Sequence, residues 1–165
     1  MKKIFSIVLP VLLFACASQK DSTAVLNSKS TIESQCPPQG KCAITIHKDK
    51  SLLVKTDDFN KLYYEYAHAP GKVVVTYAYN KTKNPDYQDD FYNEEFAFES
   101  DVNLSNIKAG MMPDIYFTVN CFCRGKQGTY KAEGAEVVMI DNKLHIVLPQ
   151  IVDNQLTKEV IVSFK

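Results

Sequence analysis

The chain has 165 residues, with 19 basic and 19 acidic side chains and a formal net charge of zero. This balance provides no basic excess of the kind that binds nucleic acid, and no single-sign field that would steer a charged partner. Nine tyrosines and nine phenylalanines, without any tryptophan, favour strands over helices.

The first residues have the parts of a bacterial secretory signal. Two lysines precede an apolar run over 4–15, which is shorter than the ~20 residues that a transmembrane helix needs. The run ends in Leu13-Phe14-Ala15-Cys16, which resembles the lipobox of bacterial lipoproteins. The resemblance implies cleavage before Cys16, attachment of a diacylglyceryl group to its sulfur and, usually, acylation of the new amino terminus. Several acyl chains anchor a protein stably, at ~0.8 kcal/mol per buried methylene.

The resemblance also gives a domain plan and a location. Residues 1–15 are predicted to be the signal peptide, 16–35 the lipidated cysteine and a flexible tether, and 36–165 a single β domain. The tether prediction rests on the many Ser, Thr, Gln, Lys and Asp residues of 17–35. Lipoproteins of this kind belong to the cell envelope, so we expect the outer membrane, on its periplasmic or outer face, to be the partner of the lipid.

From Cys36 onward, apolar and polar residues alternate with the two-residue period of strands. Roughly nine short strands are expected, with turn signals between them. They include Ile44 and Ile46, Leu52 and Val54, 62–68, 73–79, Phe96 and Phe98, 115–123, Val137 and Met139, 144–148, and 160–164. This pattern predicts an all-β, two-sheet antiparallel sandwich with Greek-key connections.

One segment of the domain fits two structures. Residues 59–66 place apolar side chains on a helical face, with Asp57 or Asp58 as an N-cap. However, the segment continues through Ala-Pro-Gly at 69–71 into a strand beginning at Lys72, and Pro-Gly is typical of a type II turn. We therefore expect a hairpin of two Tyr-rich strands that turns at 69–71.

Four cysteines remain once Cys16 is assigned to the lipid, and an oxidising compartment favours two disulfides. On one strand, Cys121 and Cys123 would have Cα atoms about 6.6 Å apart, whereas disulfides prefer ~5.5–6 Å. This favours cross-pairing of Cys121 and Cys123 with Cys36 and Cys42. The alternative is a local Cys36–Cys42 bond, with Cys121 and Cys123 forming a strained bond or a free dithiol.

The Cys-x-Cys segment also has a metal-binding interpretation. Two thiolates, with Met111, Met112 and a histidine nearby, would suit soft Cu(I). Nothing in the spacing brings Met111 or His47 close to Cys121, and thiolates outside the inner membrane usually end as disulfides. We therefore predict structural disulfides, no metal site and no cofactor, with Cys121 and Cys123 as the alternative metal or redox pair.

Two charged segments, one acidic and one basic, contain residue types that occur in binding sites. The acidic residues of 86–95 could bind Ca²⁺ or form a hydrolase carboxylate pair, but they match no calcium loop, and a solvated acidic strand edge is the favoured explanation. Residues 124–128 predict a hairpin turn with a basic tip that could contact a phosphate or carboxylate. The histidines at 47, 68 and 145 are isolated and have no zinc-binding spacing.

The sequence favours a non-enzymatic function. No nucleophile elbow or paired metal-ligand motif is visible in the chain. We expect an envelope lipoprotein with a binding or assembly role, whose partner is an envelope protein or a glycan. The alternatives are a metal or thiol-redox protein that uses the Cys-x-Cys, and a hydrolase built on the acidic loop.

Overall fold

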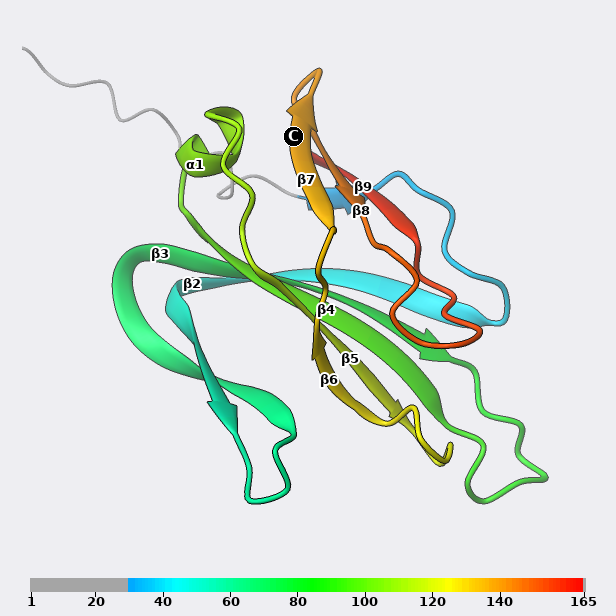
Figure 1. Cartoon of the computed structure of the whole chain (residues 1–165). Helices are drawn as coiled ribbons and strands as arrows, with labels where there is room; N and C mark the ends of the chain where they lie inside the picture. Colours follow the sequence, from blue (N-terminus) through cyan, green and yellow to red (C-terminus); the bar gives the residue numbers. More distant parts are fainter. Residues whose placement is uncertain (1–29, 165) are drawn as a thin grey trace, which may run out of the picture.

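The computed structural model describes residues 30–164, which form two antiparallel sheets. The strands are β1 (Ser30–Ile32), β2 (Gly40–Thr56), β3 (Leu62–Lys81), β4 (Tyr92–Asp101), β5 (Ile115–Cys121), β6 (Gly128–Lys131), β7 (Glu136–Ile140), β8 (Lys143–Val147) and β9 (Glu159–Phe164). One sheet has the order β1-β9-β8-β7 and the other the order β2-β3-β4-β5-β6 (Figure 1). The predicted all-β, two-sheet antiparallel sandwich is confirmed, with nine strands in this part of the chain.

The connections differ from the predicted ones. Neighbouring strands in each sheet mostly follow one another along the chain, as in a meander, and β1 is the exception because it pairs with β9. The expected Greek-key connections are not found among the described strands. Two strands are also longer than expected, since β2 has 17 residues and β3 has 20.

The facing surfaces of the two sheets form the hydrophobic core. Val73, Val75, Phe96 and Phe98 alternate with outward-facing residues on β3 and β4, and all four are completely buried. The opposite sheet contributes the apolar side chains of Val137, Leu144, Ile146, Val160, Val162 and Phe164. Each such side chain stabilises the fold by roughly 1.5–3 kcal/mol when fully buried. The core predicted from strand alternation is therefore confirmed.

The β2–β3 hairpin bends sharply at the point where the sequence predicted a turn at 69–71. In β2, a register shift occurs between Lys48 and Lys50, and Asp49 has a φ of 53°. Opposite, Gly71 of β3 has a φ of 78° and donates its N–H to the Asp49 carboxylate at 3.1 Å. The predicted hairpin turn at 69–71 is therefore wrong, and so is the helical alternative, because β3 passes through this point as one bent strand.

The bend carries the outer half of the hairpin back over the five-stranded sheet (Figure 1). As a result, Leu62 at the start of β3 pairs with Thr129 of β6. The Tyr64 hydroxyl donates a hydrogen bond to Glu95, and burial together with this bond raises the pKa of Tyr64 above its ordinary value. These contacts hold the hairpin tip next to the β5–β6 connection.

Strand β1 lies in the segment that the sequence assigned to the tether. Ser30–Ile32 pair with β9, and Glu33 donates its N–H to the Ile161 carbonyl at 2.8 Å. Ile32 is partly buried against the core. The predicted tether boundary at residue 35 is therefore wrong, because the folded domain already includes β1.

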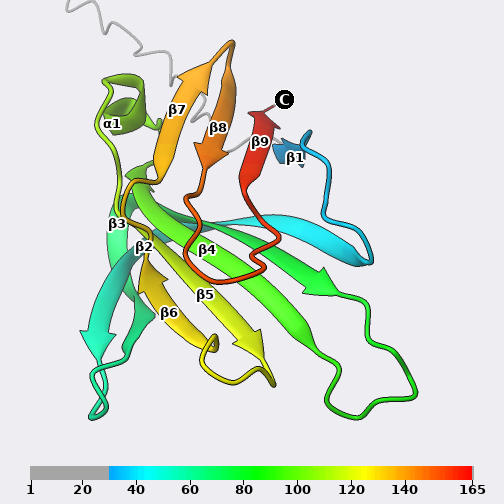
Figure 2. The same cartoon turned by 45° about the vertical axis from the view of Figure 1, so that its right-hand side comes forward.

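The connections between strands gather at the two ends of the sandwich. The β2–β3 tip (57–61), the β3–β4 loop (82–91) and the β5–β6 turn (122–127) lie at one end, which we call the hairpin end (Figures 1 and 2). The short helix α1 (Ser105–Lys108) lies at the opposite end with the β7–β8 turn. Ser30 pairs with Phe164 at that opposite end, so the described chain begins far from the hairpin end.

Candidate functional site

The predicted lipidation site, Cys16, lies outside the described residues. The same is true of the predicted signal peptide, 1–15, and of the first part of the predicted tether, 16–29. Within residues 30–164, no helix is long and apolar enough to cross a bilayer. The lipoprotein features therefore stay predictions from the sequence.

The four cysteines of the domain form two local disulfides. Cys36 is bonded to Cys42, with their Cα atoms 5.8 Å apart, and Cys121 is bonded to Cys123, with their Cα atoms 5.2 Å apart. Both bonds are local, so the predicted cross-pairing is wrong. In this bonded state neither Cys121 nor Cys123 offers a thiolate to a metal ion.

The strand order explains why the cross-pairs do not form. Cys42 lies on β2 and Cys121 ends β5, with β3 and β4 between them. Three strand spacings amount to roughly 14 Å, whereas a disulfide requires Cα atoms about 4.4–6.8 Å apart. Alternation indicates the face on which each cysteine lies, but not how many strands separate the two cysteines.

Each local disulfide forms where the backbone leaves the extended conformation. Between Cys36 and Cys42, Gln39 has a φ of 61° and turns the chain into β2. Strand β5 ends at Cys121, and the following turn brings Cys123 closer than an extended strand would allow. In the chain-entropy model, loops this short contribute roughly 2–3 kcal/mol for Cys36–Cys42 and 1–2 kcal/mol for Cys121–Cys123.

The soft donors considered for Cu(I) are not brought together. Met111 and Met112 precede β5, whereas Cys121 ends it, roughly 20 Å away at ~3.3 Å per residue. His47 instead packs against Tyr66, with 4.6 Å between the ring centroids. Residues 30–164 hold no group of three or more His, Cys, Asp or Glu side chains that could bind a metal ion.

The acidic residues of 86–95 also fail to form a common site. Asp90 forms an ion pair with Lys81 at 2.7 Å, and this contact is the main cause that lowers the pKa of Asp90. Glu94 and Glu95 are adjacent on β4, so their side chains lie on opposite faces of the sheet. The calcium and hydrolase interpretations gain no support from this arrangement.

Glu94 has a structural role that the sequence did not indicate. Its side chain is completely buried, and its carboxylate accepts hydrogen bonds from the backbone N–H groups of Leu156 and Thr157 at 2.7 and 2.6 Å. The Tyr92 hydroxyl donates a third hydrogen bond at 2.6 Å. Glu94 thereby fastens the connection between β8 and β9 to β4.

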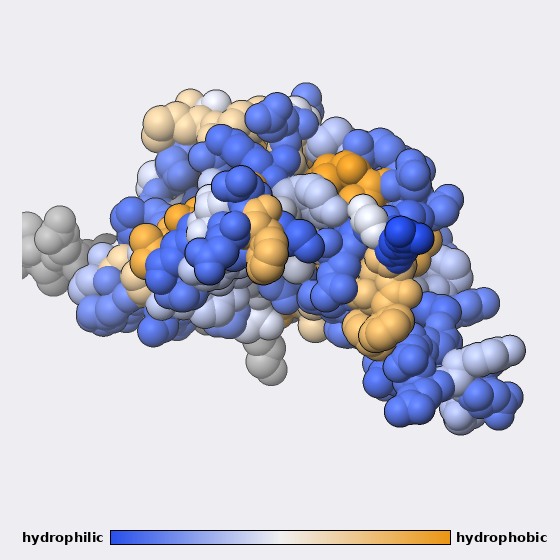
Figure 3. Space-filling model, turned by 60° about the horizontal axis from the view of Figure 1, so that its bottom comes forward, coloured by the Kyte–Doolittle hydropathy of each residue, from blue (hydrophilic) through white to orange (hydrophobic). Residues whose placement is uncertain are grey.

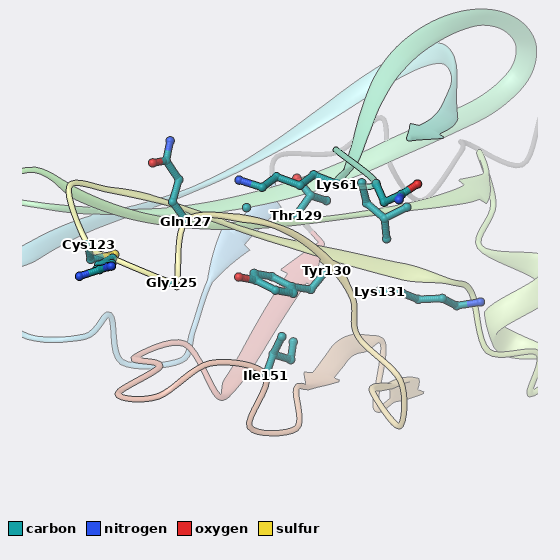
Figure 4. A pocket seen from close by; sticks show the side chains of 12 residues that line it. Lys61, Cys123, Gly125, Gln127, Thr129, Tyr130, Lys131 and Ile151 are labelled. Atoms are coloured by element: carbon teal, nitrogen blue, oxygen red, sulfur yellow. The ribbon is translucent and has the colours of Figure 1, made fainter. Parts of the chain in front are cut away.

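That connection forms one wall of a cleft at the hairpin end, with a volume of about 680 Å³. The other walls are the β2–β3 tip and the β5–β6 hairpin. Figure 4 shows Tyr130 in the middle of the cleft, with Ile151 pointing towards its ring and Lys61 extending over the hairpin towards Gln127. No carboxylate of the described chain lines the cleft.

The cleft contains cations without acidic partners. Lys131 points away from Lys61 (Figure 4) and forms an ion pair with Asp114 at 2.8 Å, which raises the pKa of Lys131. Lys61 and Arg124 form no ion pair with any residue of 30–164. Unpaired cations in a concave site without carboxylates favour an anionic ligand.

Two exposed aromatic rings belong to the turns that border the cleft, although neither ring lines it and Phe122 lines the neighbouring hollow. Phe59 and Phe122 are 83% and 78% exposed, and each directly precedes a residue that lines the cleft. The Asp57 carboxylate accepts the N–H groups of Phe59 and Lys61, both at 2.8 Å, whereas Phe122 lies between two bonded cysteines. Both rings are therefore presented by short constrained turns, and the hairpin end shows separate apolar patches within a hydrophilic surface (Figure 3).

The sequence predicted only one wall of this site. The turn at 124–128 and its basic tip were expected, and Gly125 has the positive φ, 79°, that such a turn requires. Lys61 and Ile151 were missed because they come from distant segments. No local signal links either residue to the turn. The bend in the β2–β3 hairpin brings Lys61 there, and the Glu94 contacts and the Lys126–Asp153 hydrogen bond hold the segment of Ile151.

Comparison with known proteins does not assign the chain to a family. No protein-family model matches it, and neither does any curated protein or solved structure.

Proposed function

We propose that this chain is a non-enzymatic lipoprotein of the bacterial cell envelope that binds an envelope protein or glycan at its hairpin end. The observation that carries the proposal is the cleft of about 680 Å³. It is concave, it lies between three separate segments, and its volume is typical of ligand sites. The lipobox at Leu13-Phe14-Ala15-Cys16 supports attachment to the outer membrane through the lipid.

The position of the cleft supports a hairpin end that faces a binding partner, with the lipid attached at the other end of the domain. The described chain begins at Ser30, beside Phe164 and far from the cleft. A lipid attached at Cys16, before Ser30, therefore leaves the cleft free to meet a partner. Loops held on a rigid sheet are the usual place for binding residues.

Replacing Cys16 with serine is expected to release the protein from membranes into the soluble fraction. The serine cannot receive the diacylglyceryl group, and the acyl chains are the expected source of membrane affinity. Cell fractionation followed by a high-salt wash measures the shift, and a Cys36→Ser/Cys42→Ser variant is the matched control because it should stay with the membranes. If the Cys16→Ser protein still sediments with washed membranes, the lipid is not its anchor.

A second candidate function is thiol–disulfide exchange at the Cys121–Cys123 bond, and the position of Cys123 favours it. Cys121 is only 2% exposed, whereas Cys123 is partly exposed and lines the cleft. Cys123 also lines a second hollow on the side of Phe122. A dithiol can therefore approach Cys123 Sγ from two sides, attack it and release Cys121.

In the folded protein, dithiothreitol is expected to reduce the Cys121–Cys123 bond before the Cys36–Cys42 bond. Cys123 lines two hollows, whereas the Tyr77 hydroxyl contacts Cys42 Sγ at 2.9 Å, which hinders attack on the second bond. Alkylation at successive times, followed by peptide mapping, gives the order. Simultaneous reduction, or reduction only when the domain unfolds, would argue against the exchange function.

A further inference from the structure

We infer that the cleft at the hairpin end is a binding site for an acidic glycan, with Lys61 and Arg124 as the groups that bind its anionic substituents. This inference rests on the proposed function and names the class of ligand for the same site. It is carried by three independent observations: the free polar groups in the cleft, the exposed aromatic rings of the bordering turns, and the distribution of charge at the hairpin end.

The first observation is a set of polar side chains without partners inside the protein. Lys61, Arg124, Asn60 and Gln127 all line the cleft. None of these side chains has a hydrogen bond or ion pair with another residue of 30–164. Two cations can bind carboxylate, phosphate or sulfate groups, and two amides can each donate and accept hydrogen bonds. A ligand with anionic groups among many hydroxyls satisfies all four side chains.

The hydroxyl groups of the cleft extend this pattern. The Tyr130 hydroxyl donates to the Lys126 carbonyl at 3.0 Å, so its oxygen remains able to accept a hydrogen bond. The Thr129 and Thr118 hydroxyl oxygens are 3.0 Å apart. Such groups, which both donate and accept, match sugar hydroxyls better than they match the acceptor-only oxygens of a carboxylate-rich peptide.

The second observation is the pair of exposed rings. Phe59 and Phe122 are the two most exposed large apolar side chains of residues 30–164, and they belong to the two turns that border the cleft. An aromatic face carries partial negative charge and attracts the polarised C–H groups of a sugar ring. Because both turns are constrained, little conformational freedom is lost when a ligand stacks on these rings.

The third observation argues against an anionic lipid surface as the partner. The hairpin end also carries Asp57, Asp58, Asp86 and Asp89, which lie outside the cleft on the β2–β3 tip and the β3–β4 loop. A flat anionic bilayer would bring its charge against these carboxylates at the same time as it met the cations. A single glycan chain lying in the cleft contacts Lys61 and Arg124, and no carboxylate of residues 30–164 lines the cleft.

The test uses the full chain in detergent micelles and three probes of similar length. The probes are an oligogalacturonate, the neutral oligogalactose and an oligoglutamate peptide, and titration calorimetry measures their affinities. We expect the oligogalacturonate to bind at least tenfold more tightly than the neutral oligomer. Its affinity should fall with rising salt concentration, because exposed charges are screened.

Matched variants separate the two parts of the site. Lys61→Ala/Arg124→Ala should weaken oligogalacturonate binding at least tenfold, and Phe59→Ala/Phe122→Ala should weaken it severalfold without affecting the peptide. Lys108→Ala, an exposed change on α1 at the opposite end, should leave binding unchanged. Thermal melts show that each variant is folded.

Three results would overturn the inference. If the neutral oligomer binds as tightly as the oligogalacturonate, Lys61 and Arg124 do not bind anionic groups of the ligand. If the peptide binds more tightly than the oligogalacturonate, the partner is an acidic protein. Absence of binding to all three probes rejects the acidic glycan. The last result leaves the proposed attachment intact, because fractionation of the Cys16→Ser variant tests that separately.

Discussion

Replacing Glu94 with alanine is expected to lower the free energy of unfolding by about 3–5 kcal/mol. The carboxylate is completely buried and accepts three hydrogen bonds, from the Leu156 and Thr157 N–H groups and from the Tyr92 hydroxyl. Hydrogen bonds to a charged group contribute roughly 1.5–3 kcal/mol each, and the alanine variant leaves buried donors without an acceptor. Urea denaturation of wild type and variant measures the difference.

Two further variants make the Glu94 result specific. Glu94→Gln keeps an acceptor oxygen but loses the charge, so its loss should be smaller, about 1–3 kcal/mol. Glu136→Ala removes an exposed carboxylate on β7 and should change stability by less than ~0.5 kcal/mol. A Glu94→Ala protein as stable as wild type would mean that the β8–β9 connection does not depend on this carboxylate.

The Glu94 contacts also couple the core to the cleft. The β8–β9 connection supplies Ile151, which points towards Tyr130 in the cleft (Figure 4). Glu94→Ala removes two of the hydrogen bonds that anchor this wall and leaves the bond from Lys126 Nζ to the Asp153 carbonyl. Glu94→Ala should therefore weaken ligand binding as well, although Glu94 itself does not line the cleft.

Strand alternation predicted the sheet faces and the core because it is a local property. Phe96 and Phe98 were expected to share a face, as were Ile115, Phe117 and Val119, and all of them are buried. The turn between β7 and β8 is equally local, since Asp141 and Asn142 both have the positive φ typical of a two-residue turn. Such features depend on neighbours in the sequence, so the sequence alone indicates them.

The features that the sequence did not predict depend on contacts between distant segments. Turn-forming residues at 49–50 and 69–71 lie opposite each other in one hairpin, where together they produce a bend instead of two turns. The order of strands keeps Cys42 away from Cys121. The cleft combines three segments that meet through this bend, the Glu94 contacts and the Lys126–Asp153 hydrogen bond. Its basic turn was visible in the sequence, but its full set of residues was not.

Strand β1 shows how the polar composition of a segment led to a wrong boundary between tether and domain. The segment 17–35 is rich in polar residues, which is typical of a flexible tether. A three-residue edge strand needs only one apolar anchor, and Ile32 provides it by pairing with Val162 and packing against the core. So short a pattern does not stand out from a polar background.

Replacing Ile32 with aspartate is therefore expected to destabilise the domain by about 2–3 kcal/mol, because a carboxylate would lie against an apolar surface without a partner. The matched variant Ile32→Val keeps the apolar contact and should cost less than ~1 kcal/mol. Thr31→Ala, an exposed change in the same strand, should have no measurable effect. Urea denaturation of the three variants distinguishes a docked strand from a tether. In a tether, Ile32→Asp would be as stable as wild type, since an unpaired polar segment accepts a charge at no cost.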